Sequence, residues 1–226
     1  MRPLRLHPLA LTRQGDDVQV ADAAPPLQDL SEVRAYWGKH FNVGRWPVED
    51  LYYGLVERFV GDVVLADPPA FAKVQGRSCL YLANHQVGIE SLLFSLLISA
   101  LSKTPTVTLA KAEHRTSWLG TLIAHNFSYP GVVDPAVITF FDRDDKESLL
   151  RIVGELRAAM NERGKSVMVH VEGTRSLACG QPVAKMSSIF IDMALAIGAP
   201  RAAMSMPSTS STETKARGVR DSVFIA

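Results

Sequence analysis

The segment CLYLANHQVGIE, residues 79–90, combines a buried strand with the start of a helix. Residues 79–83 are apolar or aromatic throughout, as in a strand that is covered on both faces. Gly88 and the apolar run that follows Glu90 favour a turn into a buried helix. A strand that leads through a short polar turn into a helix is typical of open α/β sheets, which place ligands at the carboxyl ends of their strands.

A second segment of this kind, VMVHVEGTRS, occupies residues 167–176. Its apolar strand ends at a carboxylate, a glycine, two hydroxyl side chains and an arginine. We expect further strands at 106–110 and 137–141, and helices that begin at 47 and 89 and cover 146–163 and 186–197. Because strands and helices alternate, we predict an α/β domain with a mostly parallel central sheet flanked by helices.

His85 and Glu90 are the candidate catalytic residues. A carboxylate on the first turn of a helix, five residues after a histidine at a strand end, can reach one imidazole nitrogen. The carboxylate then fixes the tautomer and stabilises the imidazolium, so that the other nitrogen can accept a proton. The pair comes without a protein nucleophile, and we therefore expect the substrate to bring one, most simply a hydroxyl.

Polar residues around the two turns are candidate substrate-binding groups. Asn84 is expected to position a carbonyl group or the loop, and Gly88 allows a ligand to approach the backbone closely. Gly173 exposes backbone amides, and Arg175 suits bidentate binding of a phosphate. His170 alternates with a methionine along its strand and is interpreted as a packed side chain.

The two segments resemble motifs of the phospholipid and glycerol acyltransferase family, which includes the 1-acylglycerol-3-phosphate O-acyltransferases. The family's first motif is Asn-His, four further residues and an aspartate. It is matched by Asn84 and His85, with Glu90 in place of the aspartate. The third motif, Pro-Glu-Gly-Thr-Arg-Ser, is matched by residues 172–176, with Val171 in place of proline.

Two further stretches lie in the order that the family shows. An apolar strand leading to an arginine is matched by residues 138–143, and a lysine after the strand that follows the first motif is matched by Lys111. The segment 118–120 is similar to the family's next helix entry. Four ordered motifs make the resemblance specific.

The resemblance implies an O-acyltransferase of phospholipid biosynthesis. Such an enzyme moves a fatty acyl group from acyl-CoA or acyl carrier protein to a hydroxyl of a lysophospholipid or glycerol phosphate. It also implies that His85, oriented by Glu90, is the general base. The expected substrate-binding residues are Asn84, Lys111, Arg143, Glu172, Gly173, Thr174, Arg175 and Ser176. Among them, Arg143 and Arg175 are expected on the acceptor's phosphate, and Glu172 on its hydroxyls or in organising the site.

Besides Val171, two further features depart from the family pattern. Glu90 is one methylene longer than aspartate, so the geometry of its pairing with His85 must shift, although its charge and hydrogen-bonding capacity remain. After Pro200, where the family continues with a buried strand, the chain runs into RAAMSMPSTSSTETKARGVRDSVFIA. We expect a truncation or frameshift there, and therefore a disordered tail at 201–226. At the other end, Pro25-Pro26 is a linker signal, so we expect a flexible segment at 1–28 and one domain at 29–200.

Composition limits the classes of partner. With 226 residues, 47% of them hydrophobic, the chain can bury a full core as one domain. A net charge of +1 argues against an extended nucleic-acid surface. No run reaches the ~18 apolar residues of a membrane-spanning helix. We therefore expect a cytoplasmic protein, peripheral at the inner membrane face. Two cysteines give no metal pattern, and we expect no metal and no cofactor besides the acyl donor.

Two other functions remain open from the sequence. The substitution at Glu90 and the altered tail are compatible with a catalytically inactive protein that binds lipid or acts as a scaffold. An acyl-thioester hydrolase, in which water replaces the acceptor alcohol, is the other.

An apolar pattern at Leu51, Leu55 and Phe59 predicts a further helix. Its tyrosines, together with Trp46, either face a membrane or an acyl chain or simply pack in the core.

Overall fold

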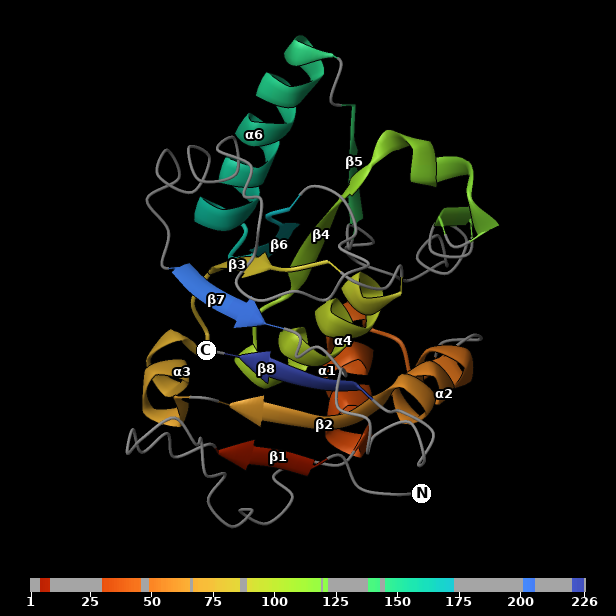
Figure 1. The fold of residues 1–226 in the computed structure, drawn as a ribbon, viewed down its shortest axis with the longest axis vertical. Coiled ribbons are helices and arrows are strands. Elements are labelled where there is room, and N and C mark those ends of the chain that lie inside the picture. Colours follow the sequence, from red (N-terminus) through yellow and green to blue (C-terminus); the bar gives the residue numbers. More distant parts are fainter. Residues whose placement is uncertain are drawn as a thin grey trace, which may run out of the picture.

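An eight-stranded sheet organises the described part of the chain (Figure 1). The structure is a computed structural model that describes residues 5–8, 30–45, 49–65, 67–85, 89–118, 120–121, 138–142, 145–172, 201–205 and 221–225. The strands are β1 Arg5–Pro8, β2 Val60–Leu65, β3 Leu80–Ala83, β4 Thr106–Lys111, β5 Ile138–Phe141, β6 Ser166–His170, β7 Arg201–Ser205 and β8 Asp221–Ile225. Their spatial order is β1-β2-β8-β7-β3-β6-β4-β5.

All neighbouring strands in this order are parallel except β7 and β8, which run antiparallel. Strands β3 and β6 lie next to each other near the centre, in a register that sets Ala83 opposite His170. The predicted α/β fold with a mostly parallel sheet is therefore confirmed, and the two segments that were singled out in the sequence end at the same edge of the sheet.

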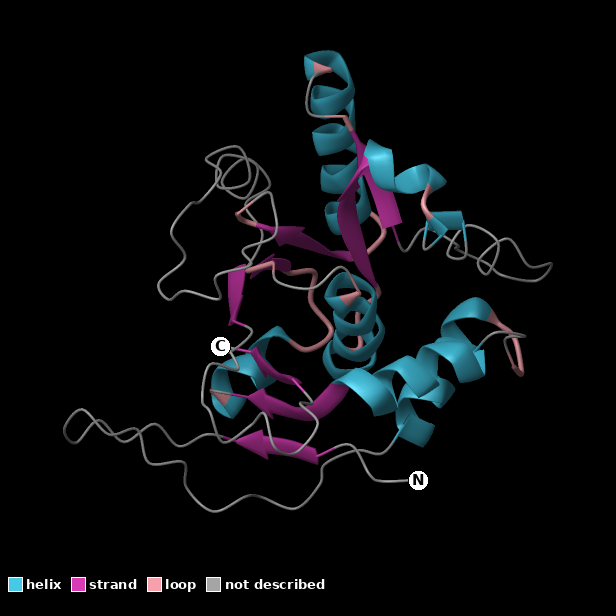
Figure 2. Cartoon of the chain, turned by 45° about the vertical axis from the view of Figure 1, so that its right-hand side comes forward, coloured by secondary structure: helices cyan, strands magenta, loops and turns pink. Residues whose placement is uncertain are grey.

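Helices pack on both faces of these central strands. The helices are α1 Leu30–Phe41, α2 Glu49–Phe59, α3 Pro68–Val74, α4 Glu90–Ser102, the short 3-10 helix η1 Ala112–Thr116, and α6 Lys146–Asn161. On one face, Tyr81 and Met168 pack in a core cluster with α1, α2 and α4. On the other, Leu80 and Val167 pack with α6. Figure 2 shows α4 beside α1 and α2, with α6 apart from them.

Helix α4 is the buried helix that the sequence predicts after residue 89. Most of its residues are buried, among them Phe94 and Ile98. The indole N–H of Trp37 on α1 donates to the Leu96 carbonyl of α4 at 2.9 Å, which ties the two helices together inside the core. A helix packed on so many sides has a fixed rotation, so the position of its first residue, Glu90, is fixed at the sheet edge as well.

Helix α6 begins at the predicted residue and ends at Asn161, two residues before the predicted end. Asp145 caps it by accepting from the backbone N–H groups of Glu147 and Ser148. Past its end, Gly164 has a φ of +62°, a left-handed conformation that favours glycine. Its buried face includes Leu156 and Met160, as the 3.6-residue spacing predicts.

The prediction for α2 is correct in type but wrong in its buried face. Leu51 and Phe59, which belong to the apolar pattern, are 46% and 43% exposed, whereas Tyr52 and Tyr53 are buried. Large aromatic rings bury more apolar surface than a leucine does, and here they decide the rotation of the helix. The alternative that the tyrosines simply pack in the core is confirmed for these two; Trp46 lies outside the described residues.

Three strands lie in segments where the sequence predicts no regular structure. Strand β7 pairs with β3, β8 pairs with β2 and β7, and β1 pairs with β2. The structure thus describes strands at residues 5–8, 201–205 and 221–225, within the segments expected to be flexible or disordered. Each of these strands has only four or five residues, too few for a clear period of its own, and forms because a neighbouring strand offers its backbone groups. The limits of the domain stay predictions, and the helix expected at 186–197 lies outside the described residues.

Candidate active site

The candidate site forms where β3 and β6 end side by side. The backbone N–H of Val171 donates to the Ala83 carbonyl at 2.9 Å, so the pairing continues one residue beyond β6. This extension places the turn that begins with Asn84 and His85 against the turn that contains Glu172. Because the strands are parallel, both turns emerge at the carboxyl edge of the sheet, as the sequence predicts.

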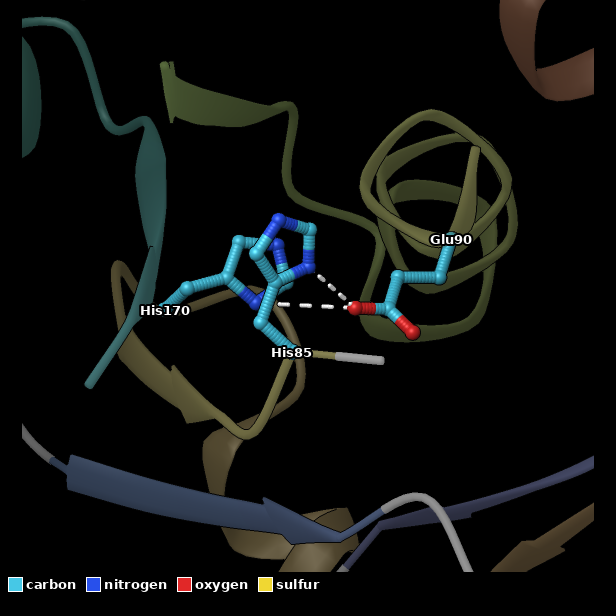
Figure 3. Close-up of side chains that lie close together, drawn as sticks. All are labelled: His85, Glu90 and His170. Atoms are coloured by element: carbon cyan, nitrogen blue, oxygen red, sulfur yellow. Dashed lines mark hydrogen bonds and ion pairs between the residues drawn. The ribbon is translucent and has the colours of Figure 1, made fainter. Parts of the chain in front are cut away.

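His85 and Glu90 form a close pair (Figure 3). The Nδ1 atom of His85 lies 2.5 Å from Oε1 of Glu90. A carboxylate accepts hydrogen bonds, so Nδ1 carries the proton and Nε2 keeps its lone pair. The Glu90 side chain is only 6% exposed, and that of His85 is 17% exposed. The longer glutamate thus reaches the imidazole from the first turn of α4, and the nitrogen that can act as a base belongs to a side chain that is partly open to solvent.

Glu172 joins the second turn to the first. Its Oε2 atom accepts a hydrogen bond from the backbone N–H of His85 at 2.9 Å, and its side chain is buried. Of the two roles that the sequence suggests for Glu172, this contact favours organising the site. The carboxylate holds the backbone of the histidine, while Glu90 orients its ring.

His170 completes the cluster and was missed as a site residue by the sequence-based prediction. Its Nδ1 atom lies 2.7 Å from the Asn84 carbonyl oxygen, and its Nε2 atom lies 2.6 Å from Oγ of Ser91. A carbonyl only accepts, so Nδ1 is the protonated nitrogen and Nε2 accepts from the Ser91 hydroxyl. The ring stacks on that of His85 with 3.9 Å between centroids and 25° between planes (Figure 3).

Burial keeps His170 neutral. It lowers the pKa of His170 from the usual 6.5 to about 4, and the nearby His85 acts in the same direction, whereas Glu90 and the Asn84 carbonyl oppose the shift. His170 therefore stays uncharged at neutral pH.

His85, Glu90 and His170 are ligand types that a metal ion also takes, and their ligand atoms lie within 4.8 Å of one another. The hydrogen bonds do not fit that use. Nδ1 of His170 carries a proton toward the Asn84 carbonyl, and Nε2 is occupied by the Ser91 hydroxyl. A metal needs an imidazole lone pair that points at it, so coordination through Nε2 requires displacing the Ser91 hydroxyl, and coordination through Nδ1 requires losing its proton and the contact with Asn84. The absence of a metal stays a prediction.

A comparison with protein families identifies the chain. The family profile described as Acyltransferase matches residues 69–208, which is more than half of the chain. The chain belongs to the acyltransferase family. No sequence among curated proteins matches it. The matched region contains the whole His85, Glu90 and His170 cluster, and it runs past Pro200 into β7.

Other predicted binding residues of this acyltransferase are placed only in part. Lys111 ends β4 at the same sheet edge, and its Nζ lies 3.4 Å from a carboxylate oxygen of Glu113. Asn84 is buried, and its backbone carbonyl contacts His170. The remaining candidates, Gly88, Arg143, Gly173, Thr174, Arg175 and Ser176, lie outside the described residues.

Removing the Glu172 carboxylate tests its part in the site. We expect Glu172→Ala to lower the activity of the acyltransferase by about 10- to 100-fold, because the backbone of His85 loses the group that holds it. Glu172→Gln keeps an amide oxygen that can accept the same hydrogen bond, and we expect it to keep most of the activity. Steady-state rates of the two variants, with matched circular dichroism spectra, check this. Equal losses in both would contradict the backbone role.

The lowered pKa of His170 predicts a dependence of stability on pH. Between pH 6.5 and about 4, this histidine is protonated in the unfolded chain but largely unprotonated in the folded chain. The free energy of unfolding therefore falls as pH falls through this window, by up to about 1.4 kcal/mol per pH unit. We expect His170→Gln to make the decline shallower. Urea unfolding at pH 7, 6 and 5 gives the free energy of unfolding of both proteins. If it declines equally with pH in both, the pH dependence does not come from His170.

Proposed function

We propose that this acyltransferase moves a fatty acyl group from acyl-CoA or acyl carrier protein to a hydroxyl of a lysophospholipid or glycerol phosphate, with His85 as the general base. The observation that carries the proposal is the pairing of His85 Nδ1 with the buried carboxylate of Glu90. The pairing leaves Nε2 as the basic atom, and within the described residues nothing hydrogen-bonds to that atom. A proton-accepting nitrogen with no protein hydroxyl attached to it suits an acceptor substrate that brings its own hydroxyl.

The transfer proceeds through these groups in two proton movements. His85 Nε2 takes the proton of the acceptor hydroxyl while the oxygen attacks the thioester carbonyl carbon. Glu90 stabilises the imidazolium that forms. The tetrahedral intermediate then collapses, the carbon–sulfur bond breaks, and the leaving thiolate takes the proton from Nε2. The products are the ester and the free thiol, and the enzyme returns to its first protonation state.

The polar residues that the sequence predicts for substrate binding bind the acceptor. Arg143 and Arg175 hold the phosphate, since guanidinium groups bind phosphate oxygens in pairs. Lys111, at the same sheet edge, adds positive charge. Asn84, Glu172, Gly173, Thr174 and Ser176 are the further residues for acceptor binding, and backbone amides near Gly173 support the oxyanion.

The acceptors in question are amphiphiles, and we place the enzyme at a membrane surface, on the cytoplasmic side of the inner membrane. In the part of the chain that the structure describes, no helix has both the length and the apolar character needed to cross a bilayer. Phospholipid biosynthesis is the process that consumes such a donor and acceptor pair, and neither a metal nor a further cofactor enters the proposed steps.

Acceptor dependence of thiol release tests the proposal. The purified chain is mixed with a long-chain acyl-CoA, and free thiol is followed with and without lysophosphatidic acid or glycerol 3-phosphate. We expect release only when an acceptor is present. The same assay with acyl carrier protein as donor distinguishes the two donors.

The other outcomes of this assay point to other functions. Release that does not depend on any acceptor indicates a thioester hydrolase. Binding of acyl-CoA or lipid without release, from either donor and with either acceptor, indicates a protein that binds lipid without turnover. Both results would contradict the proposed transfer.

A further inference from the structure

His170 contacts the residues on both sides of the proposed base and its carboxylate. Asn84, whose carbonyl accepts from Nδ1, immediately precedes His85, and Ser91, whose hydroxyl donates to Nε2, immediately follows Glu90. One imidazole on β6 thus connects the end of β3 to the first turn of α4.

We propose that His170 is a positioning residue, which holds the ring of His85 in the orientation and tautomer that the transfer needs. This rests on the proposed function of His85. His170 does so by stacking on one face of that ring, at 3.9 Å between centroids, and by fixing the backbone before His85 and the side chain after Glu90. The ring of His85 is then confined by a carboxylate at its edge and a flat aromatic surface on its face.

The positioning role also depends on the protonation state of His170. The charged or titratable groups that contact it are His85 from the turn after β3 and Glu90 from α4, whose Oε1 lies 3.9 Å from Nδ1 of His170. On its own strand's end, Glu172 holds the backbone of His85. Because His170 is neutral, the carboxylate of Glu90 pairs with His85, at 2.5 Å, rather than with His170. A neutral His170 also places no second positive charge next to His85 when His85 accepts a proton.

A different role for the same contacts is a Ser91 nucleophile activated by His170. The order hydroxyl, imidazole and carbonyl is similar to a catalytic triad. Two observations favour positioning instead. His170 is buried, with a pKa of about 4, and is a weak base at neutral pH. The group that holds Nδ1 of His170 is a neutral backbone carbonyl, which stabilises an imidazolium less than the carboxylate of a triad does.

Nitrogen NMR of labelled histidine tests the positioning directly. In the wild-type chain we expect His85 to be protonated at Nδ1 and unprotonated at Nε2 at neutral pH. In His170→Ala we expect a mixture of the two His85 tautomers, because the stacked ring and its two anchors are gone. His170→Asn, whose amide N–H can still donate to the Asn84 carbonyl, should lie between them. His85→Ala identifies the His85 signals.

Kinetics give the second readout. We expect His170→Ala to lower kcat by about 10- to 100-fold, with the KM for acyl-CoA changed less than about threefold, and His170→Asn to recover part of the loss. Ser91→Ala should lower kcat by less than about tenfold and give no covalent intermediate. The NMR test does not require turnover, so it distinguishes failure of the positioning from failure of the proposed acyl transfer.

Either of two results would overturn the proposal. One is an unchanged His85 tautomer in a folded His170→Ala or His170→Asn variant, which would make His170 a packed side chain only. The other is an acyl adduct on Ser91 in the wild-type chain, found by mass spectrometry of the acid-quenched reaction and absent in Ser91→Ala, because it would make His170 the base for a nucleophile.

Discussion

Replacing His85 with alanine is expected to lower kcat for acyl transfer by about 10³-fold. The substitution removes the imidazole that pairs with Glu90, and with it Nε2 of His85, the atom that we propose takes the acceptor's proton. A positioned general base contributes roughly 10²- to 10⁴-fold, and alanine leaves the neighbouring ring of His170 neutral and fully hydrogen-bonded. Acceptor-dependent thiol release, measured with saturating donor and acceptor, gives the loss in kcat.

The matched control is His40→Ala on α1, whose ring stacks on Tyr36 outside the cluster. It should keep activity within about twofold, whereas His85→Ala should still bind acyl-CoA, since the base acts on the acceptor. Residual turnover in His85→Ala within tenfold of wild type, in a preparation with a wild-type circular dichroism spectrum, would show that another group removes the proton.

The second large effect is expected for Glu90→Gln, with a loss in kcat of about 10²- to 10⁴-fold. Glutamine has nearly the same size, so the buried position stays filled. Its amide can donate to Nδ1 of His85 through N–H, and the imidazole then carries its proton on Nε2 instead. That tautomer cannot accept a proton from the substrate, which is the known result of replacing a triad carboxylate by an amide. Removing the negative charge also leaves the imidazolium unstabilised.

Glu155→Gln on α6, an exposed glutamate, is the control for the same chemical change. It should leave kcat unchanged. Steady-state kinetics gives the loss, and nitrogen NMR of labelled histidine gives the cause, because Glu90→Gln should move the proton of His85 from Nδ1 to Nε2. A Glu90→Gln variant with normal kcat would mean that the carboxylate only fills space beneath the sheet edge.

Much of the fold was readable from the sequence because its signals are local. The apolar run before Asn84 predicts β3 to within one residue, and the spacing of Leu156 and Met160 predicts α6 with its stop near Gly164. The pair of His85 and Glu90 was predicted from a spacing of five residues between a strand end and a helix start. The structure adds that a glutamate also spans this distance.

What the sequence could not give depends on contacts between distant segments. His170 is 85 residues from His85, and its strand pattern is that of any buried side chain; only the register of β3 and β6 brings it beside the site. A polar residue at the last position of a central strand, next to a predicted site, is the signal that could have found it. Likewise, β7 and β8 form by pairing with β3 and β2, and their own sequences show no alternating apolar pattern that would predict a strand.

The most direct test of His85-dependent acyl transfer is a single-turnover reaction that counts both products. Excess enzyme is mixed with labelled acyl-CoA and lysophosphatidic acid, and the thiol and the acylated acceptor are measured in the same sample. We predict one acylated acceptor for each thiol with the wild-type chain, and almost none of either on the same timescale with His85→Ala. Thiol without acylated acceptor, or equal product from both proteins, would contradict the assignment.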